Sequence, residues 1–349
     1  MALATLLVRW FSVGLVLLVA QAAAAQDAGS FDRGRTIRLI VGGRRGSDAD
    51  IYARLIAKYL GRHIGGHPAV AVADMPGNGG HVAAGYIYSA APKDGTAIGT
   101  VPAAVLTAPL WFGFGTVPHD PTQFLYLGSA ASESTDCFVG GDTPIGNFRD
   151  AFAREVTMGA TAGDGPTRDG PLLLNAMLGT RFRVIAKYAG TRDILAAINN
   201  GAVMGACGLT WSSVATRHPH WLPKGVLRGL VQESVAGSPL AARLGIPLAV
   251  SYAGSAADAE TLALAYAQQA FGKPFFLPPG TPPGTTEALR AAFMDTLHDA
   301  GLLADAKAAS LAIDPVSGPS VRAQIAKLYA TPAQTLDRVR AVFGGAQVR

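Results

Sequence analysis

The sequence predicts an α/β protein made of two similar domains that face each other across a cleft. Strand-like and helix-like segments alternate from Thr36 onward, which is typical of parallel strands joined by right-handed helical crossovers. The same alternation, again with glycine-rich loops, restarts after residue 134. A chain of 349 residues is also long enough for about two domains. We therefore expect two α/β units with a binding cleft between them.

The first 25 residues have the order of a secretory signal peptide. A single positive charge, Arg9, precedes an apolar run from Trp10 to Ala20, and small residues at Ala23 and Ala25 precede Gln26. The apolar run is shorter than the roughly 20 residues of a membrane span, although a retained membrane anchor is the alternative. We predict that residues 1–25 are removed and that the rest of the chain acts outside the cytoplasm.

The first unit contains expected strands at residues 36–43, 69–75 and 96–102, and expected helices at 51–65 and 81–91. In the first helix, apolar residues recur at helical spacing from Ile51 to Leu60. Two glycine-rich loops, from Gly42 to Asp50 and from Pro76 to His81, follow the first two strands. Because parallel strands end at the same edge of a sheet, both loops should open there, where such sheets bind ligands.

The second unit repeats this pattern. Strands are expected at about residues 155–161, 182–190 and 202–208, and helices at 170–179 and 191–201, the latter with Thr191 as its N-cap. The C-terminal third should contribute a helix at 259–272, a strand with a proline-rich turn at 273–284, and helices at 285–301, 302–312 and 320–343. These last helices are expected to pack onto a domain that is already built.

Two cysteines, Cys137 and Cys207, lie in segments that read as buried strands. Because an exported chain meets an oxidising environment, we predict a disulfide between them, with two buried free thiols as the alternative. Neither has a histidine at ligand spacing, so no metal site is expected. The net charge is +5 and the pI is near 9.3, but the basic residues are scattered. We expect no nucleic-acid partner and only a mild preference for anionic solutes.

The loop from Pro76 to His81, which contains Gly77, Asn78, Gly79 and Gly80, leads directly into a helix. Unpaired N–H groups and the helix dipole favour anions at such a position, so a phosphate or a carboxylate would fit. The lysine and Ser/Thr of a nucleotide-binding loop are absent after the last glycine. An ordinary strand-to-helix turn is the alternative interpretation.

The first loop adds charged candidates for the binding site. Arg44 and Arg45, beside Gly46 and Ser47, could bind a carboxylate in bidentate fashion or lie solvated on the surface. Asp48 and Asp50 could cap the following helix, contact a ligand or bind a cation. The candidates in the second unit, in the loop after its first strand and around the start of its second helix, are Thr161, Gly163, Asp164, Tyr188, Gly190 and Asp193.

The sequence contains no complete catalytic set. The nucleophile motif GxSxG and the zinc motif HExxH are both missing, and His218 and His220 flank a proline in what we expect to be a surface loop. We therefore expect a protein that holds a solute without transforming it, with no cofactor and no metal. An enzyme that uses the same cleft is the alternative.

Over nearly its full length after residue 25, the chain resembles the solute-binding receptors of tripartite tricarboxylate transporters, the Bug receptor family. The segments that carry the resemblance, in this order and spacing, are "IRLIVGG", "GSDADIYARLIAKYLGRHI", "DMPGNGGHVAAGYIYSAAPKDGTAIGT", "YAGTRDILAAINNGAVMGACG" and "GKPFFLPPGTPPGTTEALRAAFMDTLHDAG". The resemblance implies a two-domain periplasmic-binding-protein architecture of type II, the Venus-flytrap arrangement, with a ligand cleft between the domains. We place the domains at residues 30–128 plus 268–349 and at 129–267.

The resemblance also implies a function. Receptors of this family are periplasmic, act without catalysis, and pass a small di- or tricarboxylate, or a related organic acid, to a separate membrane permease. We expect the same here, with the receptor acting as a monomer. A receptor that signals to a membrane sensor instead is the alternative.

In the family, two loops of the first domain hold one ligand carboxylate, mostly through backbone N–H groups and ordered waters. Here they correspond to the stretches from Gly46 to Asp50 and from Pro76 to His81. Asp50 and Tyr52 fit the family pattern, as do Pro76 with Gly77 and Tyr188 with Gly190. The departures are Arg44, Arg45 and His81, which stand where the family has small residues or proline and which we expect to narrow the pocket.

Overall fold

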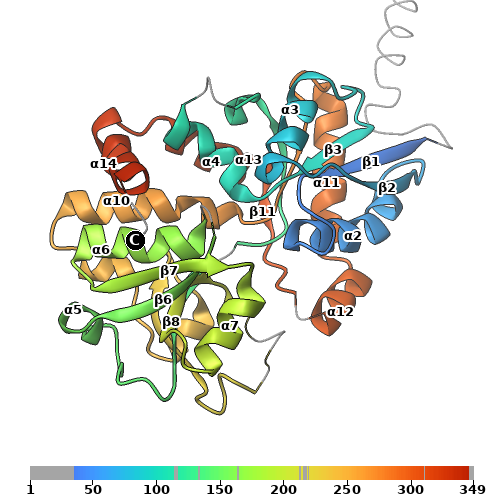
Figure 1. Cartoon of the computed structure of the whole chain (residues 1–349). Coiled ribbons are helices and arrows are strands. Elements are labelled where there is room, and N and C mark those ends of the chain that lie inside the picture. The colour runs from blue at the N-terminus through green and yellow to red at the C-terminus, as the bar shows by residue number, and fades with distance from the viewer. Residues whose placement is uncertain are drawn as a thin grey trace, which may run out of the picture.

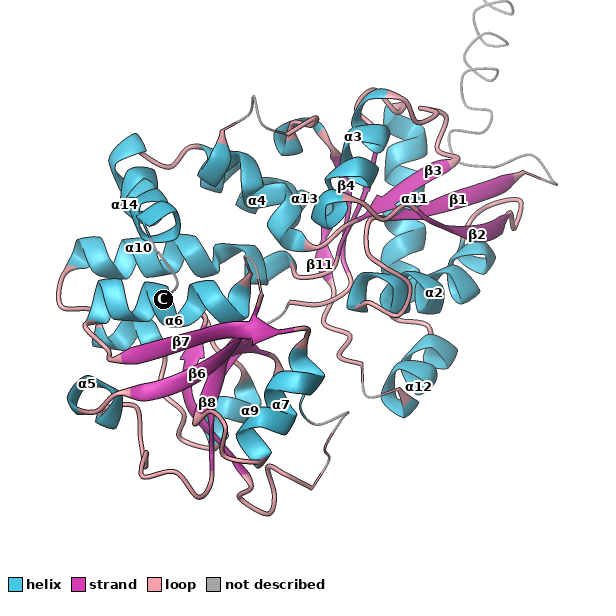
Figure 2. Cartoon of the chain, in the orientation of Figure 1, coloured by secondary structure: helices cyan, strands magenta, loops and turns pink. Residues whose placement is uncertain are grey.

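The structure is a computed structural model that describes residues 35–113, 117–132, 134–162, 165–211, 214, 218, 220–309 and 311–345. Its strands form two separate mixed sheets, one in each half of the molecule (Figure 1, Figure 2). Helices cover both faces of each sheet. The predicted α/β class with two units is therefore confirmed.

The first sheet has six strands in the order β11-β4-β10-β3-β1-β2. The N-terminal strands β1, β2 and β3 pair in parallel, as the alternation predicts. By contrast, β10 enters from the C-terminal third, lies in the middle of the sheet and is antiparallel to both β3 and β4. The strands are β1 (Thr36–Val41), β2 (Ala69–Asp74), β3 (Ala97–Thr100), β4 (Leu125–Ser129), β10 (Pro274–Leu277) and β11 (Val316–Ser317).

Alternating side chains of β1 pack on the two faces of the first sheet. Leu39 joins a core with α2 and α11, whereas its neighbour Ile40 joins a core with α3, α4 and α13 on the other face. Because both faces are covered, the strand is almost continuously apolar. The helices around this sheet are α2 (Asp48–Leu60), α3 (His81–Ser89), α4 (Ala103–Phe112), α11 (Pro283–Leu297), α12 (Ala300–Ala308) and α13 (Gly318–Tyr329).

The second sheet has five strands in the order β7-β6-β8-β5-β9. Its β6 is parallel to β7 and β8, and β5 is antiparallel to β8 and β9. Cys137 faces the core beneath α6 and α10, and Phe138 faces the core beneath α7. The strands are β5 (Thr135–Gly140), β6 (Val156–Thr161), β7 (Phe182–Tyr188), β8 (Gly205–Leu209) and β9 (Leu227–Glu233); the helices are α5 (Asp150–Ala153), α6 (Pro166–Leu178), α7 (Thr191–Asn199), α9 (Pro239–Arg243) and α10 (Ala256–Tyr266).

Helix α2 follows the first glycine-rich loop, and Ser47 is its N-cap, accepting from the Asp50 N–H at 3.4 Å. Its buried side includes Tyr52 and Ile56. Ile51, which the periodicity assigns to the apolar side, is 38% exposed. That assignment is wrong because Tyr52 and Ile56, which pack in the β1 core, set the rotation of the helix.

Two helix starts in the second unit differ from the prediction. Helix α6 begins at Pro166, inside the stretch that we expected to be loop, because proline is well suited to the first turn of a helix. The N-cap of α7 is Gly190, and no side chain caps it, so Thr191 is the first helical residue rather than the cap.

The chain passes between the sheets twice, from β4 to β5 and then through the short helix η6 (Ala267–Phe271) to β10. The C-terminal helix α14 (Ala333–Gly345) also contacts both halves. Its Val339 is buried in the core beside α4, and Val342 packs against the core beneath α6 and α10. Figure 1 shows α14 next to α10.

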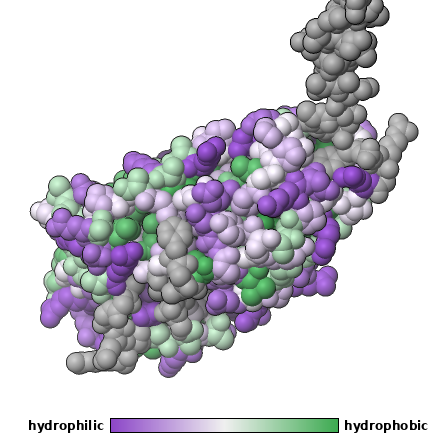
Figure 3. Space-filling view, turned by 90° about the horizontal axis from the view of Figure 1, so that it is seen from above, coloured by the Kyte–Doolittle hydropathy of each residue, from purple (hydrophilic) through white to green (hydrophobic). Residues whose placement is uncertain are grey.

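The surface seen in Figure 3 is a mixture of hydrophilic and hydrophobic residues, with the apolar ones in small separate patches. Within the described residues, none of the helices has both the length and the apolar composition needed to cross a lipid bilayer.

Candidate functional site

A cleft of about 580 Å³ lies where the two halves meet. The ends of β1, β2 and β3 and the loops that follow them form most of its wall, and η6 with Lys273 forms another part. Thr135 of β5 and Pro166 of α6 contribute from the second half. The volume falls within the usual range for small-molecule sites, about 300–1,000 Å³. The predicted site residues that line the cleft are Arg44, Ser47, Asp48, Tyr52, Pro76, Gly77, Asn78 and Gly79.

The loop after β2 has an unusual backbone. Four successive residues have positive φ angles: Gly77 (152°), Asn78 (42°), Gly79 (65°) and Gly80 (115°). Glycine adopts such angles without steric cost, and asparagine tolerates the left-handed region, so this sequence is suited to this turn. Helix α3 starts immediately afterwards, at His81. Consecutive N–H groups at a turn beside a helix start form a concave surface that attracts anions.

The two glycine-rich loops contact each other. A Cβ added to Gly42 would lie 2.9 Å from Val101 Cγ1 and 3.1 Å from the Cα of Gly80. Glycine is therefore needed at this position for the loops to approach so closely. The result is that the ends of β1 and β2 form one continuous part of the cleft wall.

Asp50 holds the first loop in place. Its side chain is only 3% exposed, accepts from the Gly46 N–H at 2.7 Å and pairs with Arg54 at 2.7 Å. Burial tends to raise the pKa of Asp50, but the hydrogen bonds from Arg54 and Gly46 outweigh it and the pKa is lowered. The Asp50 carboxylate thus makes its contacts with groups of the protein itself. Neither Asp50 nor Gly46 is part of the cleft wall.

The two arginines of the first loop differ in position. Both are exposed, but Arg44 lines the cleft and Arg45 does not. Asp48, in the first turn of α2, lines the cleft and pairs with Lys273, with 3.2 Å between Asp48 Oδ2 and Lys273 Nζ.

Lys273 is a cleft residue that sequence reasoning missed. Its side chain is 9% exposed, and its Nζ lies 5.3 Å from the centre of the Tyr52 ring. The available signal was a lysine directly before the apolar strand Pro274–Leu277. Gln268 and Gln269 of η6 and Thr100 of β3 were missed as well, and all three line the cleft.

His81 and Gly80 lie behind the cleft wall. The His81 ring is 5.3 Å from the ring of His119, and burial lowers the pKa of His81. The Gly80 N–H donates to the Gly77 carbonyl within the loop. His81 is not among the residues that line the cleft, and its ring contacts His119, so nothing in this structure shows His81 narrowing the pocket.

The predicted residues of the second unit lie at the ends of β6 and β7, whose arrowheads in Figure 1 point toward the other half. Thr161 ends β6, and its N–H donates to the Thr167 hydroxyl at 3.1 Å. Tyr188 ends β7, and Gly190 and Asp193 lie at the start of α7. None of these four lines the cleft in this structure. Gly163 and Asp164 lie outside the described residues.

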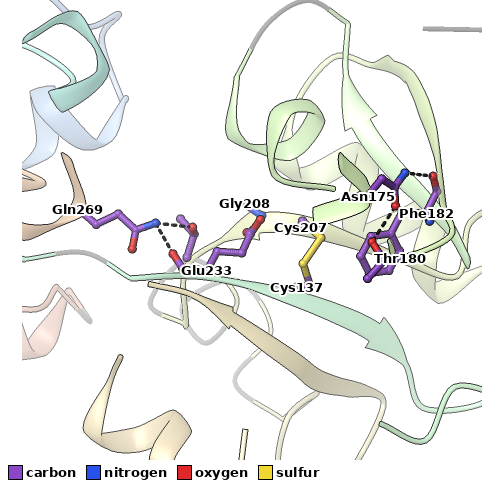
Figure 4. The surroundings of a disulfide bond; sticks show 9 residues. Cys137, Asn175, Thr180, Phe182, Cys207, Gly208, Glu233 and Gln269 are labelled. Atoms are coloured by element: carbon purple, nitrogen blue, oxygen red, sulfur yellow. Dashed lines mark hydrogen bonds between the residues drawn. A yellow bond between two sulfur atoms is a disulfide. The ribbon is translucent and has the colours of Figure 1, made fainter. Parts of the chain in front are cut away.

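Gln269 joins η6 to the second sheet. Its Nε2 donates to the Thr135 hydroxyl at 2.9 Å and to the Glu233 carbonyl oxygen at 2.5 Å (Figure 4).

Two buried carboxyl groups, Asp136 and Glu233, lie close to this contact and are 0% and 1% exposed. Burial raises the pKa of Asp136 to about 8 and that of Glu233 to about 7, although the Gly208 N–H, 2.7 Å from Glu233 Oε2, acts in the opposite direction on Glu233.

Cys137 and Cys207 are joined by a disulfide between β5 and β8 (Figure 4). Within the described ranges, the one group of residues close enough together to hold a metal consists of these cysteines and Glu233. Because the two sulfur atoms are bonded to each other, they are not available as thiolate ligands.

Comparisons with known proteins identify the fold. No protein-family model matches the chain, and no curated protein sequence does. Solved structures do match. A TctC solute-binding protein from Polaromonas is 15% identical, with a TM-score of 0.67, over 89% of this chain and 99% of that one. MatC from Rhodopseudomonas palustris, solved with malate, is 18% identical, with a TM-score of 0.59, over 87% and 99%.

A further R. palustris protein, solved with adipate, is 18% identical, with a TM-score of 0.60, over 87% of this chain and 97% of that one. At these identities the comparisons show the fold. The chain therefore has the two-domain α/β fold of periplasmic solute-binding proteins, and its resemblance to the receptors of tripartite tricarboxylate transporters is confirmed at that level.

Proposed function

We propose that this protein is an extracytoplasmic solute-binding receptor. It captures a small carboxylate-bearing solute, a di- or tricarboxylate or a related organic acid, and delivers it to a membrane permease of the tripartite tricarboxylate type. It acts as a monomer in the periplasm after removal of the signal peptide at residues 1–25. Proteins of the same fold have been solved with malate and with adipate, which supports this class of ligand.

The observation that carries the proposal is the loop from Pro76 to Gly79 on the cleft wall. Its successive positive φ angles and the start of α3 create an environment for an anion, and no side chain is needed to supply the charge. We assign the N–H groups of Asn78 and Gly79 as donors to the ligand carboxylate. Among the described residues that line the cleft, Arg44 and Lys273 carry positive charges and Asp48 carries a negative charge.

The mechanism is closure of two domains around the ligand. The domains consist of residues 30–128 with 268–349 and residues 129–267, and the ligand binds first to the loops of the former. Closure then brings the ends of β6 and β7, with Thr161, Tyr188 and Gly190, against the exposed side of the ligand. Asp193 lies in the first turn of α7 beside them.

The test is a thermal-shift screen of the chain from Gln26 onward against organic acids, amino acids, aromatic acids, amines and sugars. A ligand present at about 100 times its Kd stabilises the protein by about 2.7 kcal/mol, which is a readily measured increase in Tm. We expect at least one di- or tricarboxylate to raise the Tm. A panel in which only amines or sugars raise it contradicts the carboxylate assignment.

A further inference from the structure

Lys273 is a buried cation on the wall of the ligand cleft. Its side chain is 9% exposed, and it follows η6 at the start of β10. The Pro76–Gly79 loop, which connects β2 to α3, lines the same cleft. The cleft thus combines a backbone site suited to an anion with a separate side-chain cation.

Several contacts fix the position of Lys273. Its N–H donates to Ser129 Oγ at 3.0 Å, and its carbonyl accepts from the Ala130 N–H at 2.9 Å. The ring of Tyr52 lies 5.3 Å from Nζ, and the Tyr52 hydroxyl donates to the Ala312 carbonyl at 2.8 Å. A charged group held in this way loses little conformational freedom when a ligand binds, so more of its attraction contributes to affinity.

Asp48 lies beside the lysine and has the opposite effect on an anion. The two side chains are 3.2 Å apart, with Lys273 buried and Asp48 63% exposed. A carboxylate that reaches Lys273 gains from the ammonium group and is repelled by the Asp48 carboxylate. The two residues should therefore change the affinity for an anionic ligand in opposite directions.

We propose that Lys273 binds the second carboxylate of a dicarboxylate whose first carboxylate lies at the Pro76–Gly79 loop, and that Asp48 competes for the same ammonium group. This inference rests on the proposed function and names the ligand class within it: solutes with two carboxylates rather than one. Lys273 is thus a specificity-determining residue of the cleft.

The experiment is isothermal titration calorimetry on the wild type, Lys273→Met and Asp48→Asn. The probes are the α,ω-dicarboxylates from malonate to adipate, each paired with the monocarboxylate of the same carbon number. Lys273→Met should weaken the tightest dicarboxylate by about 10- to 100-fold, as expected for a lost hydrogen bond to a charged group, and leave its monocarboxylate partner nearly unchanged. Asp48→Asn should strengthen binding of the same dicarboxylate.

Lys58→Met is the matched control. Its Nζ also pairs with an aspartate, Asp305 at 2.6 Å, but its side chain is 62% exposed and lies away from the cleft wall. This variant should bind every probe as the wild type does. Thermal melts of all the variants check that each one is folded.

Each contrary result identifies what has failed. A wild type that binds no carboxylic acid rejects the proposed function and this inference together. Wild-type dicarboxylate binding that survives Lys273→Met rejects only the role of Lys273. Equal weakening of mono- and dicarboxylates by Lys273→Met overturns the selection for two carboxylates. Equal weakening by Lys273→Met and Asp48→Asn means that the pair only maintains the cleft wall, which also overturns the inference.

Discussion

Gly79 is a position in the Pro76–Gly79 loop where a substitution can change ligand binding without preventing the loop from folding. Its φ angle is 65°, a value that asparagine tolerates better than other side chains, and a Cβ placed there would have no heavy atom within 4 Å. A side chain added at this position therefore enters open space on the cleft wall. Its chemical nature, and not its bulk within the protein, should determine the effect on the ligand.

We predict that Gly79→Asp and Gly79→Asn are both folded but differ in binding. The two side chains have nearly the same shape, so the backbone strain is similar, whereas only aspartate brings a negative charge to the carboxylate position. Titration calorimetry with the acid found in the thermal-shift screen should show affinity at least about tenfold lower for Asp than for Asn. Equal affinities would mean that the ligand carboxylate is held elsewhere.

For single residues, the sequence indicates which backbone conformations are needed better than it indicates which side chains will lie next to each other. The Pro76–Gly79 loop could be predicted because glycine and asparagine have conformations that other residues avoid. Lys273 could not be found in the same way, because its contact with Asp48 joins residues 225 positions apart in the chain. His81 is a second example, since its ring partner His119 comes from a different segment of the chain.

At the scale of elements, β5 and β9 carry a buried acid each, close to the contact of Gln269 with the second sheet. Asp136 and Glu233 have ordinary pKa values near 4 when unfolded, whereas burial raises them to about 8 and about 7 in the fold. Between these values the folded state binds more protons than the unfolded state. The two acids therefore stabilise the fold least at high pH, and their contribution declines as the pH rises from about 4 to about 8.

We predict that replacing both acids with their amides, Asp136→Asn with Glu233→Gln, removes this decline. The histidines His81 and His119, whose pKa values burial lowers below 6.5, act in the opposite direction, but they are the same in both proteins. The difference in Tm between the variant and the wild type should therefore grow in favour of the variant from pH 5 to pH 8. Thermal melts across this range provide the measurement, and a constant difference contradicts the prediction.

The order and type of most elements could be predicted because their apolar periods and glycine-rich boundaries are clear. The exceptions have tertiary causes. Ile51 is exposed because contacts of Tyr52 and Ile56 with the β1 core decide the rotation of α2. The antiparallel insertion of β10 between β3 and β4 depends on pairing between distant segments, which no local pattern reports.

At the scale of the whole molecule, α14 links the two halves. Val339 is buried in a core of the first half and Val342 packs against a core of the second. Arg338 pairs with Asp258 of α10, while Arg340 donates to the Leu110 carbonyl of α4 at 2.9 Å. Wide opening of the cleft must break one set of these contacts, so α14 should restrict the opening.

We predict that Arg338→Ala with Val342→Ala widens the range of this motion by weakening the contact of α14 with the second half. Small-angle X-ray scattering should give a larger radius of gyration for the ligand-free variant than for the ligand-free wild type. It should also show a larger decrease when the ligand binds. A double variant with wild-type dimensions would show that α14 does not restrict opening.

The central position of β10 has a consequence for how the chain folds. Until residue 277 has been synthesised, β3 and β4 lack the strand that lies between them, and the first sheet cannot be completed. Strands β1, β2 and β3 can pair with one another earlier, but their connection to β4 has to wait for a segment far along the chain, and contacts between such distant segments slow folding.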